Sequence, residues 1–115
     1  QGNKILPWGS PRDLFLRIKE EKLGEIFEYL KKVLAGKARI LLTAEAVEKN
    51  LFGYGKPHAE FYNRVGNIMI LPTGDNTIWY EHIKGKKFHL TGMHGGLSSG
   101  EMIIPFAFAN LSDLT

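Results

Sequence analysis

The chain has 115 residues, 43% of them hydrophobic and 23% charged, which are the length and composition of one globular domain. Its formal net charge is only +3 and most basic residues alternate with glutamates, so we do not expect a nucleic-acid partner. The sequence has no cysteine, which excludes disulfides, thiolate metal sites and a cysteine nucleophile and fits a reducing compartment. No apolar run approaches the ~18 residues of a membrane span. We therefore expect a cytoplasmic protein with no membrane partner.

The N-terminal third predicts a strand followed by a helix. Residues 1–11 are rich in proline, glycine and serine, and we interpret them as a linker or lead-in. Because they begin with Gln1 rather than Met, we expect a processed product or a piece of something longer. Residues 14–18 form a short apolar run typical of a buried strand, and residues 23–34 space their apolar side chains as one face of a helix does. Gly36 stands where a helix commonly ends.

A second strand and helix follow directly. Residues 38–42 predict the strand, and Thr43 is placed to cap a short helix that runs through about Asn50. The order is then β-α-β-α, and two strands so close in sequence favour parallel pairing through a right-handed crossover. We expect residues 12–115 to form a single α+β domain that contains this unit.

The C-terminal half predicts a hairpin and then a loop. Residues 67–71 form an apolar strand, residues 72–76 a turn and residues 77–81 another strand, which together make a β-hairpin. Residues 88–90 predict one more short strand, so that the domain should hold about five or six strands in all.

A glycine-rich loop with one histidine lies near the C-terminus. His94 is flanked by glycines within residues 92–96, and glycines permit a tight turn and a close approach to a metal or phosphate. Ser98 and Glu101 have the spacing of a capping box, which predicts a short helix after the loop. The residues alone leave two interpretations open: a histidine that offers a ring nitrogen to a ligand, and an incidental histidine on a plain turn.

Residues 92–98 (Gly-Met-His-Gly-Gly-Leu-Ser) and 101–105 (Glu-Met-Ile-Ile-Pro) resemble the last metal-binding motif of the alkaline phosphatase superfamily, type I phosphodiesterase/nucleotide pyrophosphatase branch. Residues 51–58 and 64–67 are also similar to that branch. The resemblance implies a larger α/β/α enzyme, in which two divalent metals, commonly zinc with manganese as the alternative, activate a Ser or Thr nucleophile. It also implies that His94 is a ligand of one metal, because it matches the histidine of the motif.

Two departures from the family motifs limit what the chain can do. Ser99-Gly100 stands where the family has Pro-Glu, which weakens the start of the helix without touching the ligand. The family's nucleophile and Asp-His-Gly motif have no counterpart, because no Asp-His pair occurs in the sequence. We therefore expect a C-terminal region that supplies His94 and part of the active-site wall to the remainder of the catalytic domain. The substrate would be a phosphoester or nucleotide, and the chain alone should neither catalyse nor firmly hold a metal.

Lys56 and His58 lie in a loop that could face that site, and we predict that they contact the substrate; a plain surface loop is the alternative. Two other functions stay open for the chain. One is a free-standing α+β module that binds a nucleotide or nucleic acid through the lysines of residues 84–87, and the other is a structural or oligomerising domain. The resemblance implies that residues 102–109 pack within the parent sheet, and their apolar surface would promote self-association if it were exposed.

Overall fold

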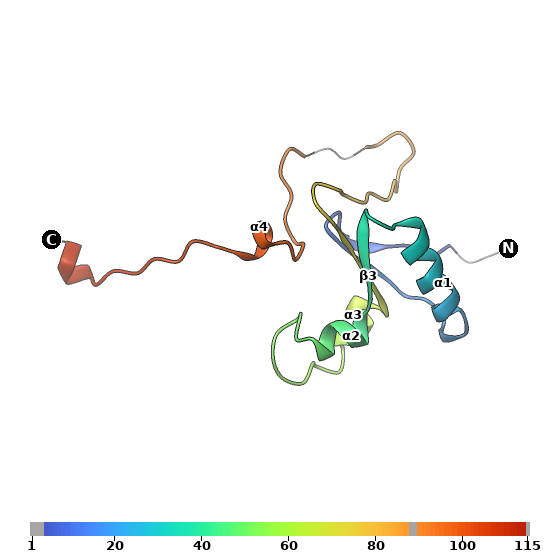
Figure 1. Ribbon diagram of the computed structural model, residues 1–115, viewed down its shortest axis with the longest axis horizontal. Helices are drawn as coiled ribbons and strands as arrows, with labels where there is room; N and C mark the ends of the chain where they lie inside the picture. Colours follow the sequence, from blue (N-terminus) through green and yellow to red (C-terminus); the bar gives the residue numbers. More distant parts are fainter. Residues whose placement is uncertain (1–3, 88–89, 115) are drawn as a thin grey trace.

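The computed structural model describes residues 4–87 and 90–114, and its centre is a four-stranded sheet with α-helices on both faces (Figure 1). A thin arm, residues 103–110, leaves this body, and the chain measures 69 × 38 × 26 Å. Among the described residues, no helix has the length and apolar character needed to cross a membrane. In chain order the elements are β1 (Trp8–Ser10), β2 (Asp13–Leu16), α1 (Glu20–Val33), β3 (Ala38–Leu42), α2 (Thr43–Glu48), α3 (Phe61–Val65), β4 (Ile68–Pro72), α4 (Ser99–Met102) and a final 3₁₀ turn (Leu111–Leu114).

The sheet has the strand order β1-β2-β4-β3, and every neighbouring pair is antiparallel. Ile70 of β4 is the partner of Leu14 on one side and of Ile40 on the other, so β4 lies between β2 and β3. All five residues of β4 are buried. A strand that is apolar on both faces belongs in the interior of a sheet, because only there are both faces covered.

The parallel pairing predicted for residues 14–18 and 38–42 is therefore wrong. β2 and β3 do run in the same direction, because each is antiparallel to β4, but β4 separates them. The strand-helix-strand unit is thus split by a strand that comes later in the sequence. The apolar side chains of β4 gain two neighbouring strands this way, whereas direct pairing of β2 with β3 would leave β4 at an edge.

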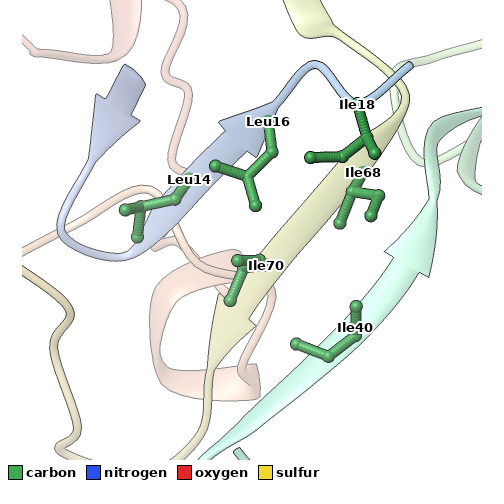
Figure 2. Close-up of a cluster of buried hydrophobic side chains, with 6 residues drawn as sticks. All are labelled: Leu14, Leu16, Ile18, Ile40, Ile68 and Ile70. Carbon is green, nitrogen blue, oxygen red and sulfur yellow. The ribbon is translucent and has the colours of Figure 1, made fainter. Parts of the chain in front are cut away.

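Alternation along the strands produces two apolar clusters, one on each face of the sheet. Figure 2 shows the first cluster, whose side chains come from β2, β3, β4 and the segment just after β2: Leu14, Leu16, Ile18, Ile40, Ile68 and Ile70. Helix α1 covers this cluster with Leu23, Ile26, Phe27 and Leu30, and Leu34 at its C-cap packs there too. The second cluster holds Phe15, Leu41, Met69 and Leu71 of the sheet with Ala46 of α2, and Val65 and Leu97 pack against it.

The predicted helices form, with one correction. Helix α1 carries glutamates in its first turn and lysines in its last, which suits the helix dipole, and Gly36 follows it with φ of 73°. The short helix after β3 also forms, but its N-cap is Leu42. Thr43 is the first helical residue rather than the cap, and its buried Oγ1 has no hydrogen-bond partner among the described residues.

The predicted hairpin of residues 67–71 with 77–81 does not form. Residues 77–81 are not a strand, and the backbone N–H of Ile78 donates to the carbonyl of Pro11 at 3.0 Å instead. Both sides of β4 are already occupied by β2 and β3, so no edge is left for a hairpin partner. Of the strand predicted for residues 88–90, positions 88 and 89 lie outside the described residues and Leu90 is not in a strand.

The described residues consequently hold four strands rather than five or six. One of them, β1, lies in the segment that we interpreted as a linker or lead-in. It pairs with β2 through a tight hairpin in which Ser10 is opposite Asp13. The fold is a small α+β domain with an antiparallel sheet.

Candidate functional site

The loop of His94, residues 92–98, is attached to the body of the domain. On its C-terminal side Leu97 packs against the second apolar cluster, and Ser98 is the N-cap of α4. His94 itself is exposed, and no described residue forms a hydrogen bond or ion pair with it. The loop therefore presents an imidazole to solvent from a fixed attachment on the sheet.

An ion pair between Arg12 and Glu101 fixes this attachment. Arg12 Nε and Nη2 donate to the two carboxylate oxygens of Glu101 at 2.8 and 2.7 Å, which is a two-point contact. The two side chains are only 6% and 14% exposed. Arg12 Nη1 also donates to the carbonyls of Gly74 and Asn76, at 2.8 and 2.6 Å. One guanidinium thus joins the β1–β2 hairpin, the turn after β4 and helix α4.

Glu101 extends these contacts into the loop itself. Its Oε1 accepts from the backbone N–H of Gly96 at 3.1 Å, and its Oε2 accepts from the Ser98 hydroxyl at 2.5 Å. The predicted capping box of Ser98 and Glu101 is confirmed. The hydrogen bond from Arg12, followed by that from Ser98, holds the pKa of the Glu101 carboxyl far below its usual range. The same contact raises the pKa of Arg12, so both groups stay charged at neutral pH.

Two glycines next to His94 are required by close neighbours. Gly95 has φ of 105°, and a Cβ there would lie 3.1 Å from Asp13 Oδ1 and 3.2 Å from Ser10 Oγ. At Gly96 a Cβ would lie 2.4 Å from Glu101 Oε2. The glycine pair therefore lets the loop approach the hairpin and the carboxylate closely: a side chain at Gly95 would be strained by its positive φ, and one at Gly96 would force the Glu101 carboxylate to move.

Ser10 and Asp13 form the surface of the β1–β2 hairpin that Gly95 approaches. The Ser10 hydroxyl donates to Asp13 Oδ1, and the backbone N–H of Ser10 donates to the same oxygen at 3.2 Å. These bonds hold the Asp13 carboxylate beside Gly95, the residue that follows His94. Beyond the loop, a hollow of about 320 Å³ lies between the turn after β4 and α4, with Asp75, Thr77, Thr91, Met93 and Ser98 among its lining residues.

The sequence predicted Lys56 and His58 as substrate contacts, and the structure places both on the loop between α2 and α3. Lys56 lines a hollow of about 200 Å³ with Phe52 and Phe61, and this hollow shares no lining residue with the one beside the His94 loop. His58 Nδ1 accepts from the backbone N–H of Glu60 at 3.2 Å. Within the described residues, no hydrogen bond or ring contact links either side chain to His94. Their role in binding stays a prediction.

Within the described part of the chain, the surroundings of His94 do not form a complete metal site. Within residues 4–87 and 90–114, no three His, Asp or Glu side chains lie close enough together to hold a metal ion. His82 is engaged with the rings of Trp79 and Tyr80, at 6.4 and 4.8 Å between centroids, and His89 lies outside the described residues. A metal bound by His94 would need its further ligands from elsewhere.

Sequence reasoning singled out Glu101 for its capping role but missed Arg12, Ser10 and Asp13. Glu101 and Arg12 are 89 positions apart, and no spacing in the sequence connects them. The Ser-Pro-Arg-Asp run of residues 10–13 has the composition of a tight turn, which is the one local signal that could have drawn attention to it.

Compared with protein-family models, with curated proteins and with solved structures, the chain shows no match.

Proposed function

We propose that the chain is the C-terminal region of a metal-dependent phosphodiesterase or nucleotide pyrophosphatase, in which it supplies His94 as one metal ligand and part of the active-site wall. The observation that supports this is the presentation of His94: an exposed imidazole on a loop anchored by a two-point ion pair that is largely shielded from water. A metal ligand needs an unengaged ring nitrogen and a fixed direction, and anchoring residues behind a ligand supply the second of these.

The likeness of residues 92–98 to the superfamily motif selects this reaction class among metal-dependent ones. A divalent pair, zinc or manganese, would supply charge to stabilise the transferring phosphoryl group. The contribution of this chain is narrower, because His94 offers its nitrogen and the Arg12–Glu101 pair holds the loop in place. The nucleophile and the remaining ligands belong to the remainder of the catalytic domain.

The first test is the reading frame that encodes the chain. An in-frame upstream segment that contains an Asp-His-Gly motif would support the proposal. In the resulting full polypeptide, His94→Ala should lower metal content by about one ion per chain and activity by at least about 100-fold.

The matched control is His82→Ala, since His82 packs against aromatic rings and has no role in the proposed site. This variant should keep its metal and its activity. A His94→Ala protein with unchanged metal content would contradict the proposal. So would a full polypeptide that has no phosphodiesterase activity and instead binds nucleic acid through the lysines of residues 84–87 in a salt-sensitive way.

A further inference from the structure

The arm carries a stripe of apolar side chains that contact almost nothing. Ile104, Phe106 and Phe108 are 73%, 84% and 89% exposed. Residues two apart in an extended segment point to the same side, and the rings of Phe106 and Phe108 indeed lie 6.1 Å apart between centroids. An apolar stripe of this size on the surface indicates a binding surface.

The body of the domain has an apolar groove that could receive such a stripe. We call it the sheet groove; its volume is about 360 Å³. Buried residues of β2 and β4 form its floor, helix α1 forms one wall and residues 78–80 form the other: Leu14, Leu16, Ile70, Leu30, Ile78 and Tyr80 are among its lining residues. Tyr29 of α1 also lines it and is 61% exposed. Helix α1 therefore leaves part of its own face of the sheet uncovered.

The arm does not reach the sheet groove of its own chain. Figure 1 shows the arm running from α4 along the long axis, away from α1, with the C-terminal end far from the helix. A second copy of the chain has both parts of the contact. Its sheet groove can receive this arm, and its arm can occupy this sheet groove. Reciprocal exchange of that kind gives a closed two-fold dimer in which each contact is made twice.

The arm alone supplies a large part of the area that a stable dimer buries. Two phenylalanines bury about 150–200 Å² each, so they supply nearly half of the ~800 Å² per partner that stable interfaces bury. Ile104 lies on the same side of the arm, is 73% exposed and adds to this, and Tyr29 and Ile5 of the groove contribute from the other side.

We propose that the arm of one chain docks in the sheet groove of a second copy, and that the second arm docks reciprocally, so that the chain is an arm-exchanged dimer. This proposal does not rest on the phosphodiesterase proposal, because it uses neither His94 nor a metal. It replaces the packing within a parent sheet that the resemblance implied for residues 102–109.

Sedimentation velocity from about 1 to 200 µM chain should show a monomer–dimer equilibrium with a micromolar Kd or tighter. The double variant Phe106→Ser/Phe108→Ser should raise that Kd on the order of 100-fold, because it removes two aromatic anchors. Tyr29→Glu should weaken the dimer from the groove side. Tyr54→Ser is the control, since Tyr54 is 95% exposed and does not line the sheet groove. All four residues are exposed, and circular dichroism will verify that each variant is folded.

The lack of cysteine in the chain permits a test of the geometry. Differently tagged Phe108→Cys and Tyr29→Cys chains, mixed and oxidised, should form a disulfide between the two tags, whereas Phe108→Cys with Tyr54→Cys should not. A monomer at every concentration, a dimer that the arm variants leave unchanged, or cross-linking of Phe108→Cys only to itself would each overturn the proposal.

Discussion

Buried Arg12 and half-buried Glu101 form a two-point ion pair across 89 positions of the sequence. Each partner also has a second role, since Arg12 satisfies two backbone carbonyls after β4, and Glu101 closes the capping box and receives the N–H of Gly96. Removing either charge leaves the other largely shielded from water and without its partner, and breaking such a pair costs more than the pair contributes.

We therefore expect Glu101→Gln to lower the thermal midpoint of unfolding by about 5–10 °C and to speed hydrogen exchange at the Gly96 amide. Calorimetry and exchange NMR measure the two effects. Glu25→Gln is a matched control, because Glu25 pairs with Lys22 on the exposed face of α1 with 70% and 62% of the side chains exposed. That variant should shift the midpoint by no more than about 1 °C. Equal effects of the two substitutions would show that Glu101 does not anchor the loop.

The ion pair also predicts how stability depends on pH. The pKa of Glu101 is lower in the folded chain than in the unfolded one, chiefly because of the hydrogen bond from Arg12. Such a carboxyl adds stability above its unfolded pKa of about 4.3 and loses it as the pH falls toward the folded pKa. The thermal midpoint of the native chain should fall as the pH is lowered from about 5, and less steeply in Glu101→Gln. Between neutral pH and pH 5 the two curves should run parallel. Identical slopes below pH 5 would contradict the assignment.

The two glycines at positions 96 and 100 provide a contrasting pair. A methyl group at Gly96 would meet the Glu101 carboxylate at 2.4 Å, so Gly96→Ala must displace that side chain or the loop. At Gly100, in α4, nothing lies within 4 Å of the added carbon. Gly100→Ala should therefore stabilise the chain by up to about 1 kcal/mol, whereas Gly96→Ala should destabilise it. Urea unfolding of both variants tests this. An unchanged free energy of unfolding in Gly96→Ala would show that the Glu101 side chain moves aside at little cost.

The core of the sheet allows the loss of stability on truncating a buried side chain to be predicted. Ile68 is completely buried between β2 and β3, in the cluster that α1 covers. Ile68→Ala removes apolar contacts and leaves a cavity, so the free energy of unfolding should fall by about 2–5 kcal/mol. Tyr54→Ala, at a side chain that is 95% exposed, should change it by about 0.5 kcal/mol or less. A loss below about 1 kcal/mol at Ile68 would mean that the site collapses around the smaller side chain.

The sequence predicted elements better than it predicted their arrangement. Helix α1 was evident because its apolar residues follow one face, and β2, β3 and β4 were evident as apolar runs. Their pairing was missed because a continuous apolar run marks a strand as buried on both faces without naming its neighbours. In this fold the two neighbours of β4 both precede it in the chain, so the turn at residues 72–76 leads away from the sheet instead of closing a hairpin.

The candidate site likewise has a part that the sequence predicts and a part that it does not. The capping box and the short helix after His94 were predictable, since both depend on residues a few positions apart. The Arg12–Glu101 ion pair that holds them was not predictable. Arg12 reaches Glu101 only once the sheet has brought the β1–β2 hairpin and the turn after β4 together. Local patterns thus identify the loop, and long-range packing determines how firmly it is held.

Lys56 offers a test of whether the loop between α2 and α3 faces substrate. If it does, Lys56→Ala in the full-length enzyme should raise KM for a phosphoester several-fold with kcat nearly unchanged, because a contact made equally in the ground and transition states affects binding alone. His58→Ala should act in the same direction. Lys32→Ala is the control, since Lys32 is an exposed lysine in the last turn of α1, outside the loop. An unchanged KM for Lys56→Ala would assign the loop to the surface, where Lys56 and the rings of Phe52 and Phe61 line a hollow of their own.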